Sequence, residues 1–150
     1  MTTELLAPAG GQEALVAAVQ SGADAVYMGF GAFNARRSAR NFSDEEFRAA
    51  VSYCHLRGVK VYLTLNTLVT ARELPALAAE ARTASECGVD AILVQDWGVL
   101  ATLQKIIPDV PLHASTQMSL HTLSGVKESA RLSMTRAVLA RELSRGEIAE

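Results

Sequence analysis

Short apolar runs alternate along the chain with longer segments in which apolar residues recur at helical spacing. The short runs predict buried or half-buried strands. We expect strands at Glu4–Ala7, Asp24–Phe30, Val59–Leu65, Asp90–Gln95, Leu112–Met118 and Arg136–Arg141. Between them, spacings such as that of Leu15, Val16 and Val19 indicate helices that bury one face. This alternation predicts the α/β class, with a parallel sheet and right-handed crossovers.

Turn and cap residues delimit the expected helices. Gly22, Gly58 and Gly88 each follow a helical segment directly, as glycines at helix C-termini do. Three segments match the capping box, in which Ser or Thr is followed three residues later by Glu. They are Ser43–Glu46, Thr70–Glu73 and Ser144–Glu147. We expect a helix to begin at each of them.

The spacing of the strands favours a TIM-like (β/α)8 barrel. The strand starts give a mean repeat of about 26 residues, so that eight units would need roughly 210 residues, near the lower end for this fold. The chain would supply about six βα units, and we expect residues 1–150 to be the N-terminal part of a barrel domain whose remainder lies beyond them. A doubly wound Rossmann sheet is the alternative, but the turn Ala7–Gly11 lacks the pattern G-x-G-x-x-G and contains Pro8, which has no amide donor.

In a barrel the functional site lies at the carboxyl ends of the strands. Polar residues gather at these ends in Asn66, Gln95–Asp96, Ser115–Gln117 and Arg141–Glu142. On the third strand, Tyr62 and Thr64 share a face with Asn66.

The expected fifth strand has one apolar and one polar face. Leu112 and Ala114 alternate with His113, Ser115 and Gln117. Since the apolar face must meet the helices, the polar three should point into the barrel. His113 and Ser115 could form a nucleophile–base pair, but no third, orienting carboxylate is evident, and a hydrogen-bonded interior pair is the other interpretation.

Roles can be assigned to the polar residues at the strand ends. Asp96, Glu142 and His113 are candidates for catalysis, whereas Asn66, Ser115, Gln117 and Arg141 are candidates for substrate binding. The two carboxylates also have structural interpretations, because Asp96 can cap the following helix and Glu142 can pair with a neighbouring arginine.

Arg36, Arg37 and Arg40 lie in the long connection Gly31–Asn41 after the second strand. They are either a solvated run of charges or a binding site for an anionic substrate such as a phosphate backbone or a carboxylate. With a net charge of −2, the chain has no overall basic field, so any contact with nucleic acid must be a local patch of this kind.

Composition excludes several classes of protein. A chain that is 49% hydrophobic and 20% charged can bury a sizeable core and is neither disordered nor fibrous. It contains no signal-peptide pattern and no apolar stretch long enough to span a bilayer, so we expect a cytoplasmic protein without a membrane partner. Cys54 and Cys87 lack metal-ligand spacing and are expected to be buried thiols. The motifs H-E-x-x-H, G-x-S-x-G and the P-loop are absent from the sequence.

Several motifs, in order along nearly the whole chain, resemble the N-terminal region of the collagenase-like peptidase family of uncatalogued catalytic type. They are E-L-L-A-P-A-G (Glu4–Gly10), G-A-D-A-V-Y-M-G (Gly22–Gly29), F-N-A-R-R-x-A-x-N-F (Phe33–Phe42), V-Q-D (Val94–Asp96), L-H-A-S-T-Q-M (Leu112–Met118) and V-L-A-R-E-L-S (Val138–Ser144). Ser133 departs from the pattern, since the family usually has glycine there.

The resemblance implies a barrel fold and leaves the activity open. Some members are described as peptidases acting on collagen, and others resemble enzymes that hydroxylate tRNA or rRNA bases or a quinone precursor, some with an iron–sulfur cluster. The cluster cysteines of such relatives lie downstream of the A-R-E-L motif, so Cys54 and Cys87 do not match them and no cofactor is expected within this chain. The F-N-A-R-R form resembles the RNA-hydroxylation branch most. Three hypotheses result: part of an RNA-hydroxylation enzyme, part of a peptidase, or a non-catalytic scaffold that self-associates as an incomplete barrel.

Overall fold

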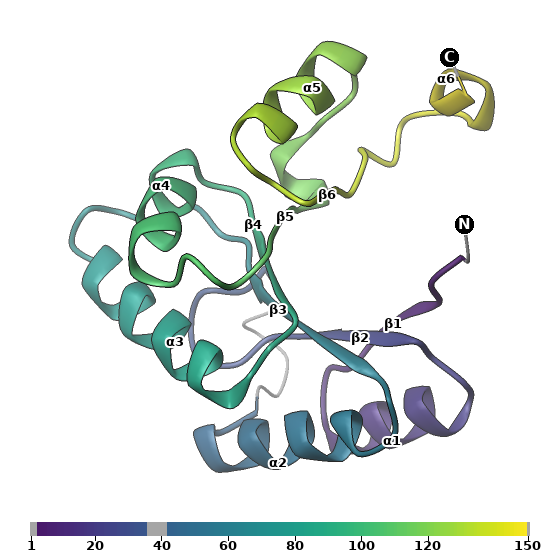
Figure 1. Ribbon diagram of the computed structural model, residues 1–150, viewed down its shortest axis with the longest axis vertical. Coiled ribbons are helices and arrows are strands. Elements are labelled where there is room, and N and C mark those ends of the chain that lie inside the picture. Colours follow the sequence, from purple (N-terminus) through teal and green to yellow (C-terminus); the bar gives the residue numbers. More distant parts are fainter. Residues whose placement is uncertain (1–2, 36–41, 150) are drawn as a thin grey trace.

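The computed structural model describes residues 3–35 and 42–149, in which strands and helices alternate (Figure 1). The strands are β1 (Leu6–Pro8), β2 (Ala25–Met28), β3 (Lys60–Leu65), β4 (Ala91–Val94), β5 (Leu112–Ala114) and β6 (Arg136–Ala137). The helices are α1 (Gln12–Gln20), α2 (Asp44–His55), α3 (Leu74–Cys87), α4 (Trp97–Ile106), α5 (Leu123–Arg131) and α6 (Arg145–Ala149), with a 3-10 turn, η1, at Thr116–Met118.

All six strands form one parallel sheet in the order β1-β2-β3-β4-β5-β6. A doubly wound sheet reverses its strand order partway, whereas here each strand simply adds beside the previous one. The sheet curves, and α1 to α4 lie along its outer side (Figure 1). The described chain is therefore a half-barrel of the α/β class, as the sequence predicts.

The two faces of the sheet differ in what they bury. The outer face packs residues such as Val61, Leu63 and Ile92 against the helices in the main core. The inner face carries a smaller apolar cluster around Tyr62 and Leu93. These positions alternate along the strands because successive side chains point to opposite faces.

His113 belongs to the inner face. Its ring meets the ring of Tyr62 edge-on, with 5.0 Å between the centroids, while Leu112 and Ala114 lie in the helix-facing core. The predicted register of β5 is therefore confirmed.

The last two strands are shorter than expected. β5 ends at Ala114. The Ser115 N–H still donates to the Val94 carbonyl of β4 at 2.8 Å, but Ser115 Oγ accepts a hydrogen bond from the Gln117 N–H at 3.3 Å, which favours the tight turn η1 over a continued strand. β6 ends at Ala137, and the Ala140 N–H donates instead to the carbonyl of Leu120. The expected strands Leu112–Met118 and Arg136–Arg141 are wrong in their second halves.

Two of the three predicted capping boxes begin helices. The Glu46 N–H donates to Ser43 Oγ at 3.2 Å, and the Ser43 N–H donates to Glu46 Oε2 at 2.9 Å. The same pair of bonds joins Ser144 and Glu147 at the start of α6. Both boxes are confirmed.

The box at Thr70–Glu73 does not begin a helix. The Thr70 N–H and hydroxyl both donate to the Glu73 carboxylate, at 2.7 and 2.8 Å, but the backbone forms a turn there. α3 begins at Leu74, with Pro75 in its first turn. Proline fits the first turn of a helix because the amide it lacks has no intrahelical partner there.

A network of charged side chains crosses the interior near the amino ends of the strands. The Glu4 carboxylate accepts hydrogen bonds from the Tyr62 hydroxyl, at 2.8 Å, and from the Arg136 guanidinium, and it lies 3.5 Å from Lys60 Nζ. These groups hold the pKa of Glu4 at about 2, with the Arg136 hydrogen bond as the largest cause. The network ties the segment before β1 to β6, the two edges of the described sheet, and no pattern in the sequence predicts it.

Candidate functional site

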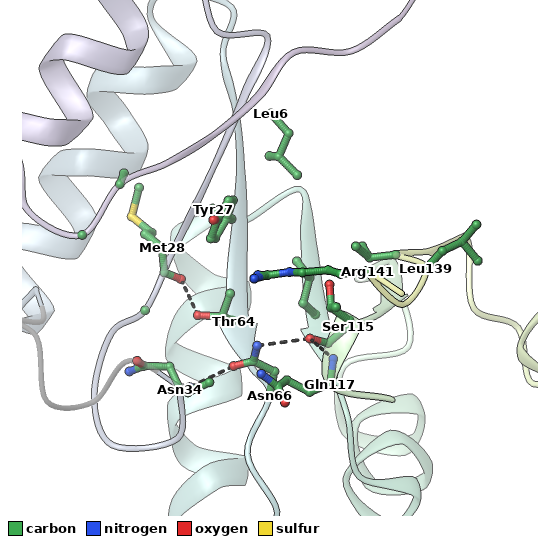
Figure 2. Close-up of a pocket in the computed structure, with 17 residues that line it drawn as sticks. Leu6, Tyr27, Met28, Asn34, Thr64, Asn66, Ser115, Gln117, Leu139 and Arg141 are labelled. Atoms are coloured by element: carbon green, nitrogen blue, oxygen red, sulfur yellow. Dashed lines mark hydrogen bonds between the residues drawn. The ribbon is translucent and has the colours of Figure 1, made fainter. Parts of the chain in front are cut away.

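A cavity of about 360 Å³ lies at the carboxyl ends of the strands (Figure 2). Its apolar lining comes from Leu6, Met28, Leu93, Val138 and Leu139, together with Ala and Gly residues after the first two strands. Its polar side chains are Tyr27, Asn34, Thr64, Asn66, Ser115, Thr116, Gln117 and Arg141. The cavity thus joins residues from all six strands or the segments that directly follow them, as expected for a barrel site.

A chain of hydrogen bonds connects three of the loops that form the cavity. The Ala35 N–H donates to Asn66 Oδ1 at 3.0 Å, and Asn66 Nδ2 donates to Ser115 Oγ at 3.1 Å. Ser115 Oγ also accepts the Gln117 N–H. Figure 2 shows Asn66 at the centre of this chain. Because both ends of the Asn66 amide are engaged, its orientation is fixed.

Asn34 is the buried polar residue of the cavity that sequence reasoning did not single out. It is 2% exposed, and a Cβ added at Gly29 would overlap its side-chain amide. Gly29 is therefore required for Asn34 to lie against the end of β2. The F-N-A-R-R motif contains Asn34 and is the signal that could have identified it.

The predicted substrate-binding residues come together. Asn66, Ser115, Gln117 and Arg141 all line the cavity, and Arg141 extends into it from the segment after β6 (Figure 2). Gln117 reaches the cavity from η1 and not from a strand as expected. Their binding roles stay predictions.

The two carboxylates do not join this group. Asp96 Oδ1 accepts the N–H groups of Gly98 and Val99, at 2.7 and 3.0 Å, and so caps α4. Glu142 is exposed and lies 3.6 Å from His121 Nε2. Neither is among the described residues that line the cavity. The cap offers Asp96 two local donors, and Glu142, in the turn after β6, lies beside His121 instead of in the cavity.

His113 lies in the interior but is not one of the described residues that line the cavity. Burial, with a smaller contribution from Arg136, lowers its pKa to about 4, so its imidazole is neutral near pH 7. Ser115, two residues on, has Asn66 and Gln117 as hydrogen-bond partners in place of the expected histidine. A catalytic role for Asp96, Glu142 or His113 remains a prediction.

The other candidate residues lie outside the site. Arg36, Arg37 and Arg40 fall outside the described residues. Cys54 is buried in the helix–sheet core, where desolvation raises the pKa of its thiol to about 11, and Cys87 is half-buried. A buried thiol of this kind does not fit cluster or metal ligation, which needs a thiolate. Within residues 3–35 and 42–149, no three His, Cys, Asp or Glu side chains are grouped so as to hold a metal.

A curved parallel sheet with helices outside and a polar cavity at the strands' carboxyl ends defines a (β/α)-barrel protein of the TIM-like type. Solved structures agree with this class. A U32 peptidase of known structure superposes with a TM-score of 0.71 over 92% of this chain and 58% of that one, at 16% identity. A phosphonopyruvate hydrolase superposes with a TM-score of 0.63 over 99% of this chain and 56% of that one, at 18% identity.

The chain belongs to peptidase family U32, whose model matches residues 10–150. It is 37% identical to the tRNA hydroxylation protein P1 of Bacillus subtilis (strain 168), over 98% of this chain and 35% of that protein. It is 40% identical to the 23S rRNA 5-hydroxycytidine C2501 synthase of Escherichia coli (strain K12), over 97% of this chain and 22% of that protein. It is 33% identical to a collagenase of Porphyromonas gingivalis (strain ATCC BAA-308 / W83), over 97% and 34%. The chain therefore spans about a third or less of the length of these relatives.

Proposed function

We propose that this chain forms the substrate-binding half of a barrel in a protein that takes part in the hydroxylation of tRNA or rRNA bases. The relatives named for RNA hydroxylation support the proposal, as does the composition of the cavity. The observation that carries it is the chain of hydrogen bonds from Ala35 through Asn66 and Ser115 to Gln117, which fixes polar groups in the wall of the cavity.

The chemistry of the cavity suits a nucleobase. Neutral amides and hydroxyls can pair with the donors and acceptors at a base edge, and the Tyr27 ring can stack on its face. Arg141 is an exposed cation at the rim, where a phosphate would follow the base. A volume of about 360 Å³ is within the range of small-ligand pockets.

Two further features support contact with RNA outside the cavity. Trp97, the first residue of α4, follows the end of β4 and is 53% exposed, although it is an aromatic residue. Exposed aromatic side chains are common stacking platforms for unpaired bases. Arg36, Arg37 and Arg40 belong to the F-N-A-R-R segment, and we propose that they bind the phosphate backbone.

A peptidase is the second candidate, because the relative named a collagenase matches nearly the whole chain. Ser115 would be its nucleophile. A nucleophilic serine donates its proton to a base, but within the described part of the chain Ser115 Oγ accepts hydrogen bonds from amide donors, those of Asn66 and Gln117. This geometry favours a role for Ser115 in substrate binding over a role as a nucleophile.

Complementation of a deletion strain with the full-length protein separates the two functions. We expect RNA from the deletion strain to lack a hydroxylated base by mass spectrometry, and the wild type and Gln95→Ala to restore it. Asn66→Ala should fail to do so. Gln95 is the matched control, since it follows β4 but is not among the described residues that line the cavity. Unchanged RNA, together with collagen or casein cleavage that Asn66→Ala abolishes, would establish the peptidase instead.

A further inference from the structure

The connection between β2 and α2 rests on a carboxyl group that does not belong to the cavity. Glu80 projects from α3, and its Oε2 accepts the Ala32 N–H at 3.2 Å. Its other oxygen, Oε1, is buried and has no hydrogen-bond partner in the described part of the chain. Gly31, at φ 66°, lies so close that a Cβ there would overlap the Glu80 carboxyl group. The backbone of residues 31–32 is thus packed directly on this side chain.

The same short segment forms a wall of the cavity. Asn34 and Ala35 line it, and the Ala35 N–H donates to Asn66. Figure 2 shows Asn34 beside Asn66 at this wall. The segment is therefore fixed at two points within four residues, by Glu80 from the helix layer and by Asn66 from inside the barrel.

We propose that Glu80 is the positioning residue of the cavity, which holds residues 31–35 so that Asn34 and Ala35 close its wall. This proposal rests on the proposed function in one respect, namely that the cavity is the site where a ligand binds. Glu80 is not among the described residues that line the cavity, and it lies against Gly31 and Ala32, so it acts by placing Asn34 and not by contact with a ligand.

The protonation state of Glu80 controls how firmly the segment is held. Burial is the largest cause that raises the pKa of the Glu80 carboxyl group to about 7. The hydrogen bond from Ala32 lowers the pKa, whereas the carboxylate of Asp44, at the start of α2, raises it further. The neutral form can stay packed on Gly31 at little cost. In the ionised form, the buried negative charge has one backbone donor, the Ala32 N–H, and Oε1 has no hydrogen-bond partner among the described residues. This favours movement of the carboxylate out of the protein and into water. The wall should therefore be ordered below pH 7 and loosened above it.

Hydrogen exchange of the full-length protein without RNA tests this directly. After correction for the intrinsic rate, the peptide spanning residues 30–35 should exchange faster at pH 8 than at pH 6. The neutral fraction of a group with a pKa near 7 falls roughly tenfold between these values, which sets the expected change. The control Glu86→Gln, an exposed carboxylate on the same helix, should behave like the wild type.

Two variants at Glu80 complete the test. Glu80→Gln keeps an acceptor for the Ala32 N–H without a charge, so protection should be high and independent of pH. Glu80→Ala removes the acceptor, so exchange should be fast at both pH values. Equal protection of the wild type at both pH values, or wild-type protection in Glu80→Ala, would overturn the proposal. Because no RNA is present, these outcomes do not depend on the hydroxylation function, which the complementation experiment tests separately.

Discussion

Replacing Glu4 by Gln should destabilise the protein near neutral pH, because Glu4 anchors the network across the interior. Its carboxylate accepts hydrogen bonds from Tyr62 and Arg136. Glutamine keeps the size of the side chain but removes the charge, so Arg136 would lose its anionic partner. The two edge strands of the described sheet would then be joined less firmly.

The size and pH window of this effect follow from the lowered pKa of Glu4. A fall from 4.5 to about 2 would correspond to about 3 kcal/mol, and screening by solvent at this end of the barrel reduces our expectation to about 2 kcal/mol. Since the pKa is lowered in the folded state, the stabilisation is complete above pH 4.5 and is lost as the pH falls toward 2.

Urea unfolding at a series of pH values measures this contribution. The free energy of unfolding of the wild type should exceed that of Glu4→Gln by about 2 kcal/mol at pH 7, and this difference should shrink by more than half at pH 3. The control is Glu86→Gln, whose exposed carboxylate lies 3.9 Å from Arg48 and should contribute little. A difference that is absent at pH 7, or that does not change with pH, would refute the role assigned to the network.

Three further changes should have separable effects. Ser133→Gly should raise the free energy of unfolding by about 0.5–1 kcal/mol in urea titrations, because Ser133 has a φ of 60°. Asp96→Ala should lower the free energy of unfolding by about 1 kcal/mol through loss of the α4 cap. Asp96→Asn keeps the cap and should retain both stability and RNA modification. Loss of RNA modification in Asp96→Asn would support a catalytic role for Asp96. Replacing Arg36, Arg37 and Arg40 by Ala should weaken RNA binding and flatten its salt dependence in filter-binding assays, and an unchanged salt slope would leave them as solvated charges.

Periodicity in the sequence predicted the faces of the strands and much of the cavity. The two-residue alternation around His113 and Tyr62 placed both rings in the interior. The apolar neighbours of these residues on each strand pack against the helices, so the alternate positions face the inside of the barrel. Alternation does not say where a strand ends. Ser115 ends β5 through a local hydrogen bond to the backbone, and this moved Gln117 from a strand to a turn without removing it from the cavity.

The residues that sequence reasoning missed depend on contacts between distant segments. Glu80 lies 48 residues from Ala32, and Glu4 lies 132 residues from Arg136. In the sequence each of these carboxylates looks like an ordinary solvated charge. Only the curvature of the sheet and the packing of α3 show that Glu4 is paired with Arg136 and that the Glu80 carboxyl group is buried. The glycine expected at Ser133 is a contrasting case, since the left-handed φ there agrees with the family pattern even though the residue is serine.

Ultraviolet crosslinking of the full-length protein to RNA tests the central claim, that the cavity receives an RNA base. Mass spectrometry of the crosslinked peptides should place the nucleotide on the ends of β2, β3 and β5, in peptides that contain Tyr27, Asn66 or Gln117. Asn66→Ala should reduce these crosslinks, and Gln95→Ala should not. Crosslinks confined to the outer surfaces of α1 to α4, with none at the strand ends, would contradict the account.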